Sequence, residues 1–498
     1  ARPRADAATT LEAPPPSAPP APPGGARAAR AMPPRTLWSR FIILALCLAV
    51  VLSTLAFGTV HLWALGFFQA GAALVVALWA VDAWRTGVLR VSRNVLQLPL
   101  VGLAAVGVVQ LLPVAGGPVT MDPYATRFVL VQLVPLAVYF AAALAFVDTP
   151  GRLRTVTRTV VVFGFLLAVY GLMQHFINPA TIFWVREPRQ AQPFGPYVNR
   201  HHFAGYMELT LALPLGLIFS GAVAKERAPL YGFAALIMAI ALVMTNSRGG
   251  IISMAAEIFF LAVVAFALKR RRSGGEGRGS RMKAAAAGVA LAFVMVFAVL
   301  LGSLYFGGED ALSRLVGTVN AADPTTGRAH FWRGTLQIIK DHPVLGVGLG
   351  AFADAYTRYD TGGGAYRLEQ AHNDYLQILS DAGLVGALLG LFFVVALFRM
   401  ALRRVQSGDK FRRGVALGAL SGCAGVLVHS FFDFTLHTAA NGLLFLLLAA
   451  LATAGPHVEE ATERRGRRRR RRRQHQGSDE SAQAGEGTPE EEPQQAAA

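Results

Sequence analysis

Long apolar blocks recur along the chain, separated by shorter polar stretches. Each of about twelve blocks is close to the ~20 residues that cross a ~30 Å hydrocarbon core as a helix. The blocks begin near Phe41, His61, Val95, Phe128, Thr157, Phe203, Pro229, Gly249, Lys283, Gly383, Val415 and His437. They lack the alternating pattern of barrel strands, and open sheet edges cannot be satisfied in lipid. The pattern therefore predicts an all-α polytopic membrane protein with about twelve transmembrane helices.

Composition supports the same class. Hydrophobic residues make up 53% of the 498 residues and charged residues only 15%, whereas soluble globular chains carry roughly 25% charged residues. The two cysteines, Cys47 and Cys423, both lie within apolar blocks. We therefore expect neither a structural disulfide nor a cysteine-based metal site.

The positions of lysine and arginine predict how the helices are oriented, because basic residues are retained on the cytoplasmic side of a membrane. Every second loop is basic, as are both terminal parts. The basic segments are Arg35 to Arg40, Arg85 to Arg93, Arg152 to Arg158, Lys225 to Arg227, Lys269 to Lys283, Arg403 to Gly414 and the C-terminal tail. We expect both termini in the cytoplasm, and two long polar loops, 178–202 and 307–381, on the outer side.

The same pattern divides the chain into five parts. An Ala/Pro-rich leader at 1–34 cannot bury a core, and we expect it to be disordered in the cytoplasm. Nine transmembrane helices follow in 35–306, and a large outer loop between the ninth and tenth helices occupies 307–381. Three more helices lie in 382–456, and 457–498 forms a disordered cytoplasmic tail.

The tail carries a run of arginines between Arg464 and Arg473, followed by an acidic end. An arginine cluster next to a membrane helix is attracted to anionic lipid headgroups, at about 1 kcal/mol per basic residue. Nucleic-acid binding is the rival interpretation of such a run, but its place directly after a membrane helix argues against it. We therefore expect anionic membrane lipids, and no nucleic acid, as partners of the tail.

The large outer loop contains a segment with helical periodicity, DPTTGRAHFWRGTLQIIKDHP, at 323–343. Arg328, Trp332 and Thr335 fall on one face of this predicted helix. That face would lie on the membrane surface or on the helix bundle, so Arg328 would be held in place. The simpler alternative is that Arg328 and Arg333 are only interfacial arginines.

Glycines recur directly after this predicted helix, in PVLGVGLGAFADAY at 343–356. Such a run can bring backbone NH groups close to an anion. It follows no strand of a βαβ unit, however, and it lacks the lysine of a P-loop. We interpret it as a tight turn.

Two further polar stretches lie where helices meet the outer side. In MTNSRGGIIS, Arg248 stands between the seventh and eighth helices. An arginine at a membrane mouth can simply snorkel, but one so close to hydrocarbon is costly and needs a partner. In PFGPYVNRHHFAGYMEL, the residues Asn199, Arg200, His201 and His202 directly precede the sixth helix. Adjacent histidines on a helix point about 100° apart, so this pair does not predict a metal site.

A polar string ends the large loop, in LEQAHNDYLQILSDAGLVGALLG. It places His372, Asn373, Asp374 and Tyr375 at the outer end of the tenth helix. Histidine titrates near neutral pH and suits acid–base chemistry. Asp374 or Asn373 could orient its imidazole, and Asn373 could equally cap the helix that follows. The plain alternative is that His372 is only the first polar residue of a membrane helix.

The outer side thus offers several arginines and histidines, but no acidic cluster of the D-x-D type that holds a divalent ion beside a nucleotide sugar. Arginine forks bind phosphate oxygens without a metal. ATP and nucleotide sugars are not available on that side, so the energy of any transfer must already reside in the substrate. A lipid-linked pyrophosphate sugar meets these conditions, with no metal and no cofactor.

Four stretches occur in an order that resembles the O-antigen ligase and Wzy polymerase superfamily of bacterial inner-membrane proteins. They are NRHHFAGYMELTLALPLGL, TNSRGGIIS, GRAHFWRGTLQIIKDHPVLGVGLGAF and AHNDYLQILSDAGLVGALLG, and together they cover about 199–390. The last two are the most specific, whereas the first five helices agree with the family only in topology.

The resemblance implies a metal-independent, inverting glycosyltransferase of the GT-C type in the bacterial inner membrane. Its donor would be an undecaprenyl-diphosphate-linked saccharide, and its acceptor lipid A-core or a growing glycan. The two diphosphate-binding arginines of the family fall on Arg248 and Arg328, and its essential histidine falls on His372, which would take the proton of the acceptor hydroxyl. The supporting candidates are Arg333, Asn373, Asp374, Tyr375, Asn199, Arg200 and His202.

Two other classes of function stay open. Some relatives with this loop motif are proposed bicarbonate carriers, so the chain could be a polysaccharide or small-anion transporter. Transporters concentrate polar residues at mid-membrane, whereas the clear intramembrane acids here are only Glu208, Glu257 and Asp433. A non-catalytic scaffold for envelope assembly would tolerate the loss of His372. The motifs also do not separate a ligase, which passes a finished glycan to its acceptor, from a polymerase, which extends a lipid-linked chain.

Overall fold

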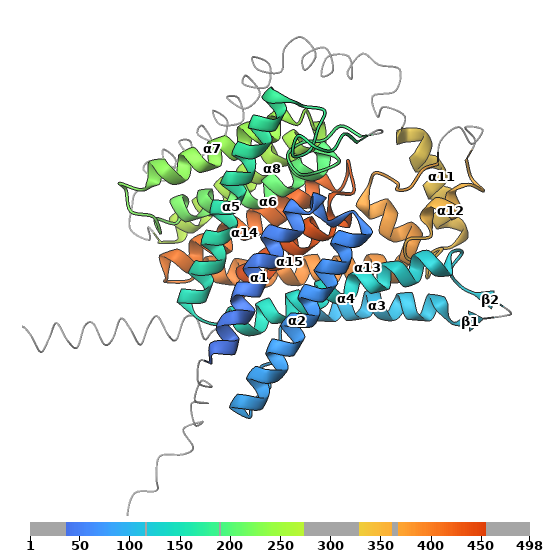
Figure 1. The fold of residues 1–498 in the computed structure, drawn as a ribbon, viewed down its shortest axis with the longest axis horizontal. Coiled ribbons are helices and arrows are strands. Elements are labelled where there is room, and N and C mark those ends of the chain that lie inside the picture. Colours follow the sequence, from blue (N-terminus) through green and yellow to red (C-terminus); the bar gives the residue numbers. More distant parts are fainter. Residues whose placement is uncertain (1–35, 115–116, 189–190, 273–327, 361–366, 455–498) are drawn as a thin grey trace, which may run out of the picture. The chain divides into compact units, whose positions relative to one another are not determined.

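The computed structural model describes residues 36–114, 117–188, 191–272, 328–360 and 367–454 (Figure 1). Over these residues the protein is all-α apart from one two-stranded ribbon, and eight helices are long and apolar enough to cross a membrane. The expected leader, the ninth helix near Lys283 and the Arg-rich tail lie outside the described residues. The prediction of an all-α polytopic membrane protein is confirmed.

Eleven of the predicted apolar blocks correspond to helices in the part of the chain that the structure describes. The long helices are α1 (Leu37–Leu55), α2 (Leu62–Thr86), α4 (Pro123–Phe146), α5 (Pro150–Ile177), α6 (Arg200–Phe219), α8 (Arg248–Arg272), α13 (Asp374–Val405) and α14 (Lys410–His429). The shorter apolar helices are α3 (Gln97–Leu111), α7 (Ala228–Met244) and α15 (Ala439–Thr453). The remaining elements are η1 (Phe57–Thr59), β1 (Pro113–Val114), β2 (Gly117–Pro118), α11 (Arg328–Asp341), α12 (Phe352–Tyr356) and η2 (Thr435–His437).

Several helices begin at a residue whose side chain binds the free backbone NH groups of the first turn. Asp122 at the start of α4, Thr149 at α5 and Asp409 at α14 all accept such hydrogen bonds. Proline follows Asp122 and Thr149 as the first helical residue, where a missing NH loses no helical hydrogen bond. These local signals explain why the membrane helices start where they do.

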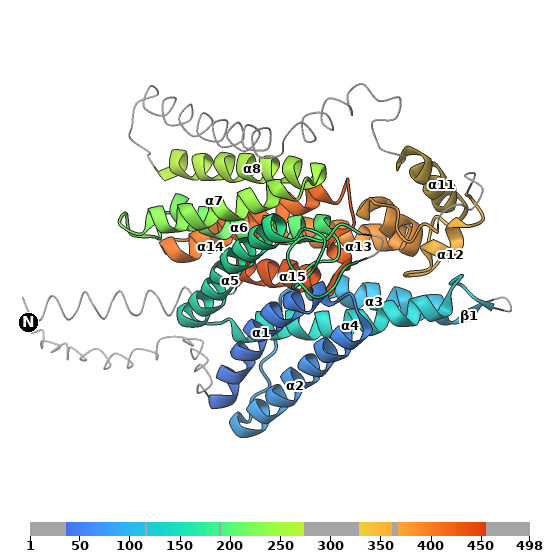
Figure 2. The same ribbon diagram turned by 45° about the horizontal axis from the view of Figure 1, so that its top comes forward.

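The buried centre is formed by α6, α14 and α15. Buried residues make up 89% of the most apolar window of α6 and 78% of that of α14, against 28% for α2. Gly414, Gly418 and Gly422 recur at every fourth position of α14 and face α6; a Cβ on Gly418 would lie 2.8 Å from the Cα of Leu213. Small residues at this spacing let two helix backbones approach closely. Figure 2 shows α7 and α8 lying beside this pair, in agreement with their packing contacts.

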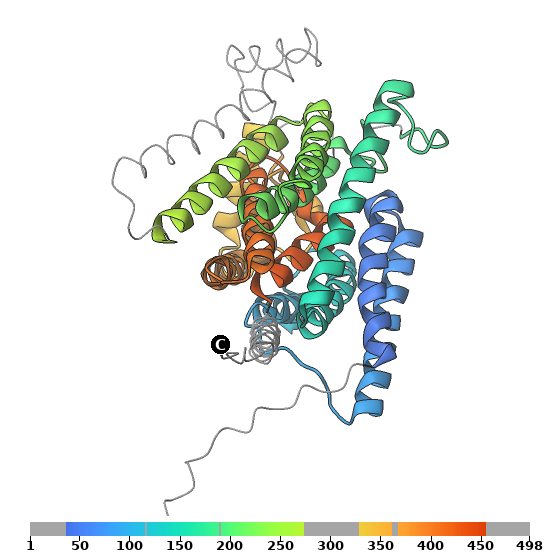
Figure 3. The ribbon, with the colours of Figure 1, turned by 90° about the vertical axis from the view of Figure 1, so that its left-hand side faces the viewer.

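The other helices pack around this centre. α1 lies beside α2 and also contacts α5 (Figure 3). α3 and α4 lie side by side, with α3 also packing on α13 and α4 on α15. Large apolar side chains such as Phe67 (75% exposed) and Leu98 (60% exposed) point outward from these peripheral helices. Such outward apolar surface is what the hydrocarbon of a bilayer would cover.

Candidate functional site

Four helix ends meet around the carboxylate of Asp433, which follows α14. His201 lies at the start of α6, Ser247 directly before α8 and His372 directly before α13. His201 Nδ1 lies 2.8 Å from Ser247 Oγ and 3.9 Å from Asp433 Oδ2, and His372 Nδ1 lies 3.3 Å from Asp433 Oδ1. The N-termini of three helices therefore lie at one place. A helix N-terminus carries partial positive charge and free NH groups, so it favours anions.

His372 and Asp433 form a histidine–carboxylate pair at this place. Asp433 is almost fully buried, with 2% of its side chain exposed, whereas 31% of the His372 side chain is exposed. Burial would raise the pKa of Asp433, but the hydrogen bond from His372 and the charges of His201 and His372 outweigh it and lower that pKa below its ordinary value. An ionised carboxylate can only accept, so His372 donates its Nδ1–H; in the neutral form of the ring, Nε2 would then be the acceptor.

Aromatic rings and backbone contacts fix the position of His372. Its ring lies edge-on to Phe434, with centroids 5.0 Å apart, and near-parallel to Phe331 of α11 at 6.5 Å. Its φ is +52°, which is costly for a residue other than glycine and persists only where the surroundings hold it. The peptide before it is bound on both sides, because Ala371 N donates to Gln377 Oε1 at 2.7 Å and Trp332 Nε1 donates to Ala371 O at 3.1 Å.

The three residues after His372 have partners of their own. Asn373 caps α13, because its Oδ1 accepts from the backbone NH groups of Tyr375 and Leu376 at 3.0 and 3.1 Å. Of the two roles considered for Asn373, orienting His372 or capping the helix, the structure shows the cap. The Tyr375 hydroxyl donates to a backbone carbonyl of α14 at 2.6 Å. Asp374 turns away from His372, and the carboxylate that contacts the His372 imidazole is Asp433.

A second histidine–carboxylate pair lies beside the first. Asp374 Oδ1 lies 3.2 Å from His437 Nε2, and Asp374 Oδ2 accepts from Ser430 Oγ at 2.8 Å. Burial would lower the pKa of His437, but the hydrogen bond and charge of Asp374, together with the charges of Asp381 and Asp433, raise it. The rings of His437 and Phe434 are 6.0 Å apart, so the two pairs share one wall of the site.

The segment around Arg248 brings α8 to the same place. Asn246 has a φ of +53° and turns the chain, and Ser247 Oγ accepts from Gly250 N at 3.2 Å at the start of the helix. Arg248 is the first residue of α8 and is half-buried. Because Ser247 also contacts His201, the arginine stands where α6 and α8 begin.

The two glycines after Arg248 allow a close approach to a buried polar group beneath the site. A Cβ on Gly249 would lie 2.9 Å from the His429 ring. His429 Nδ1 lies 2.8 Å from Glu208 Oε1, and Ser253 Oγ donates to Glu208 Oε2 at 2.9 Å. The pattern Arg-Gly-Gly is thus explained by packing: α8 can rest directly on the His429–Glu208 pair.

The residues at the start of α6 divide between two environments. Asn199 caps the helix through the backbone NH of His201, at 2.9 Å. His202 is buried, with its ring 5.2 Å from Phe434 and its carbonyl bound by Asn441 Nδ2 at 2.9 Å. Arg200 instead lines a separate cavity of about 340 Å³ between the 178–199 segment and the end of α7.

α11 reaches the site from the other side. It begins at Arg328, whose side chain lies outside the described residues, and Phe331, which contacts His372, is one turn further along. Thr335 is fully buried and Trp332 is bonded to Ala371, so the predicted face lies on the loop and on α13. Arg333 is exposed on another face.

The glycine run forms a turn that is bound to the start of α13. Gly346, Gly348 and Gly350 have φ values of +70°, +116° and +77°. Gly348 N donates to Asp381 O at 3.1 Å, and Gly350 N donates to Asp381 Oδ2 at 3.1 Å. The NH groups of Gly348 and Gly350 are therefore already hydrogen-bonded within the protein.

α13 starts at Asp374, nine residues before the apolar block, and bends at Gly383, whose φ is +62°.

Sequence reasoning missed the segment HSFFDFTLH at 429–437. It treated Asp433 as an intramembrane acid and placed the start of a helix near His437, whereas both residues line the site. The available signal was the interruption of the apolar pattern by three ionisable residues at intervals of four. Across the described ranges, no group of three or more His, Cys, Asp or Glu side chains is arranged to hold a metal ion.

Comparison with known proteins relates one part of the chain to a known family. The sequence matches no curated protein. Residues 233–391 match the family model described as O-antigen ligase, Wzy_C, and this range runs from α7 into α13 with Arg248, Arg328 and His372 inside it. The resemblance is thereby confirmed over 233–391, while the motif at 199–217 lies outside the match. Residues 233–391 are thus similar to the O-antigen ligase family.

Proposed function

We propose that the protein is a membrane glycosyltransferase of the O-antigen ligase or polymerase type. It transfers a saccharide from an undecaprenyl-diphosphate-linked donor to lipid A-core or to a growing glycan. The observation that carries this proposal is the contact between His372 and Asp433 at the common start of α6, α8 and α13, where Arg248 is the first residue of α8. The family match of residues 233–391 supports the class of donor.

His372 acts as the general base in this proposal. Its Nδ1–H is held by Asp433, so Nε2 takes the proton of the acceptor hydroxyl. The acceptor oxygen then forms a bond to the anomeric carbon from the face opposite the leaving group. The bond from that carbon to the diphosphate breaks with its electron pair, which inverts the anomeric centre and releases the lipid diphosphate.

Arg248 and Arg328 bind the donor diphosphate and stabilise the charge that grows on it. Arg248 starts α8 beside the start of α6, so two helix N-termini add favourable electrostatics for an anion. Arg328 starts α11 one turn before Phe331, which contacts His372. No step requires a metal ion. Of the remaining candidates, His202 has a supporting role because it packs against Phe434, whereas Arg200 lines the separate cavity and has no role in this proposal. Arg333 is exposed on another face of α11 and has none either.

The proposed setting is the bacterial inner membrane, with a GT-C-like fold of about twelve transmembrane helices. Both termini lie in the cytoplasm, and residues 307–381 lie in the periplasm between the ninth and tenth helices. This orientation puts His372 on the side where lipid-linked sugars are available and nucleotide sugars are not. The alternating basic loops of the sequence support it.

The test is transfer by the purified full-length protein from a synthetic undecaprenyl-diphosphate oligosaccharide. His372→Ala should lower the transfer rate about 10²- to 10⁴-fold, the typical contribution of a general base. Arg248→Ala should also weaken donor binding, because an arginine–diphosphate contact acts in the ground state as well. The matched controls are His342→Ala and Arg367→Ala, which change the same residue types in the loop region. Wild-type transfer by His372→Ala at normal abundance would refute the assignment.

The acceptor is identified by the glycan of a deletion strain. Long chains that stay on the lipid carrier without attachment indicate a ligase, and single repeats indicate a polymerase. An activity assay in detergent solution distinguishes a transporter from both a ligase and a polymerase. A transporter needs two compartments to act, whereas a glycosyltransferase forms its product in a single detergent phase.

A further inference from the structure

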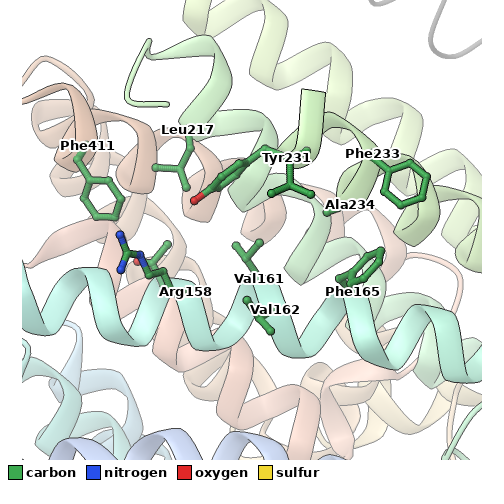
Figure 4. Close-up of a pocket in the computed structure, with 11 residues that line it drawn as sticks. Arg158, Val161, Val162, Phe165, Leu217, Tyr231, Phe233, Ala234 and Phe411 are labelled. Carbon is green, nitrogen blue, oxygen red and sulfur yellow. The ribbon is translucent and has the colours of Figure 1, made fainter. Parts of the chain in front are cut away.

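A groove lies between α5 and α7, at the end of the bundle far from His372. Its cavity volume is about 210 Å³, and its walls are Val161, Val162 and Phe165 of α5 and Leu230 and Phe233 of α7 (Figure 4). The buried side chain of Leu217 from α6 also lines it. Nearly all of this lining is hydrocarbon, so the groove suits an apolar chain rather than a sugar or a nucleotide.

The groove opens toward the lipid. Val162 is 56% exposed, Leu230 66% and Phe233 52%, and all three lie on apolar helices that pack side by side. From Arg158 to Phe165 the wall formed by α5 is about 10 Å long at 1.5 Å per residue, which is enough for part of one acyl chain. Hydrocarbon from the bilayer can therefore enter from the side.

One end of the groove is polar. Arg158 extends beside Phe411 at this end, and the Tyr231 hydroxyl points toward the same end (Figure 4). Thr157 also lines the groove and is 1% exposed, yet its buried hydroxyl has no hydrogen-bond partner among the described residues. A buried hydroxyl without a partner is costly, so an acceptor from a bound molecule would relieve it.

The surroundings of this end are basic. Arg154 lies over the Phe411 ring, with its guanidinium carbon 5.4 Å from the ring centroid. Exposed basic residues at this end outnumber acidic ones. The basic side chains are Arg154, Arg158, Lys225, Arg227 and Lys410, and the nearby acids are Glu226 and the helix-capping Asp409. A basic end next to an apolar groove is complementary to an anionic lipid.

We propose that this groove binds an anionic phospholipid, with one acyl chain between α5 and α7 and its phosphate on Arg158. The Thr157 hydroxyl then donates to a headgroup or ester oxygen of the same lipid. This site is separate from the donor site. Phe411 and His429 lie at opposite ends of α14, about 27 Å apart at 1.5 Å per residue. A diphosphate beside His372 therefore cannot also contact Arg158.

The first test is native mass spectrometry of the purified full-length protein in mild detergent, with added dioleoylphosphatidylglycerol or dioleoylphosphatidylethanolamine. The anionic lipid should bind more tightly, and Arg158→Gln should weaken its binding about fivefold. Arg85→Gln, which removes an arginine from the end of α2, should leave binding unchanged. Equal binding of both lipids, or an unchanged affinity in Arg158→Gln, would overturn the proposal. Competition by inorganic phosphate at millimolar concentration would overturn it as well, because the site would then hold a free anion.

A second pair of variants tests the chain-binding part without touching the charge. Ala234 lines the groove and Leu236, on the same helix, does not. Ala234→Phe should fill the groove and abolish selective binding of phosphatidylglycerol, whereas Leu236→Phe should not change it. Retained selective binding in a well-folded Ala234→Phe protein contradicts a chain in this groove. Transfer activity by Ala234→Phe is expected to persist, which separates this result from any failure of the proposed transfer function.

Discussion

The imidazole of His372 and the carboxylate of Asp433 are joined across 61 residues of sequence, with Nδ1 3.3 Å from Oδ1. Asp433 also accepts from Phe434 N at 2.9 Å, so its carboxylate is fixed from two sides. In the proposed reaction, this contact prepares His372 to act as the base. It fixes the ring and, in the neutral form, selects the tautomer with a proton on Nδ1, while 31% of the side chain remains exposed.

Asp433→Asn should lower kcat for glycan transfer by about 10²-fold with little change in KM, because the amide no longer selects the tautomer and the ring loses its fixed position. The double variant with His372→Ala should be no slower than His372→Ala alone, since both changes remove one function. Asp360→Asn is the matched control: Asp360 forms a similar pair with His330, at 3.3 Å, elsewhere in the loop region. Additive losses in the double variant would show that Asp433 does not act through His372.

Transfer should persist when divalent metal ions are removed. Arg248 and Arg328 can bind a diphosphate directly through charge-assisted hydrogen bonds. The purified protein is assayed in EDTA, and then with magnesium or manganese added back. An activity that returns only with one of these ions would mean that the diphosphate site holds a metal.

Gly346→Ala should destabilise the protein. Gly346 has a φ of +70°, and an added Cβ would lie 2.5 Å from the Ser380 carbonyl oxygen, so both backbone conformation and space oppose it. A residue held in such a conformation costs about 1–3 kcal/mol. The measurement is the Tm in detergent. Gly390→Ala is the control, because nothing lies within 4 Å of its added Cβ and its backbone is helical.

The helices could be predicted from sequence because each depends on a local run of apolar residues of fixed length. The start of α13 shows where this fails. Its first turns are polar and amphipathic, and they are held by the glycine turn through Asp381, a contact that no local pattern encodes. The apolar block therefore marks only the part of α13 after the bend at Gly383.

For each contact in the candidate site, the sequence indicated only one of the two residues. His372, Arg248 and the His201–His202 pair stand out in the sequence because ionisable residues next to hydrocarbon are costly and need a reason. Asp433, the partner of His372, does not, because nothing in the spacing of 61 residues indicates that the two meet. The same holds for Asp374: the sequence left it open as one of two residues that could orient His372, and in the structure it contacts His437.

The proposed orientation can be tested with two exposed positions. Lys225 lies between α6 and α7, near the basic end, and Arg358 lies directly after α12. Cys47 and Cys423 are buried, so the native thiols give little background. In intact spheroplasts Arg358→Cys should react with an impermeant thiol reagent, and Lys225→Cys should react only after permeabilisation. The opposite labelling pattern would place His372 in the cytoplasm and remove the proposed donor.

His437 predicts a stability difference that depends on pH. Its pKa is raised in the folded protein by the hydrogen bond and charge of Asp374, with Asp381 and Asp433 adding to the effect. A group whose pKa rises on folding stabilises the protein fully below its unfolded pKa, about 6.5 for histidine, and loses that contribution as the pH rises through the folded value. Wild type should therefore exceed His437→Gln in Tm by more at pH 6 than at pH 9.

The size of this difference should be modest, because 38% of the His437 side chain is exposed and solvent screens the pair. Asp433 does not confound the comparison: its pKa is lowered, so its contribution is present above its unfolded pKa and is lost only in acid, outside this window. His342→Gln serves as the control for the loss of a histidine side chain. A difference between wild type and His437→Gln that grows from pH 6 to pH 9 would mean that the neutral imidazole, not the charged one, is bound to Asp374.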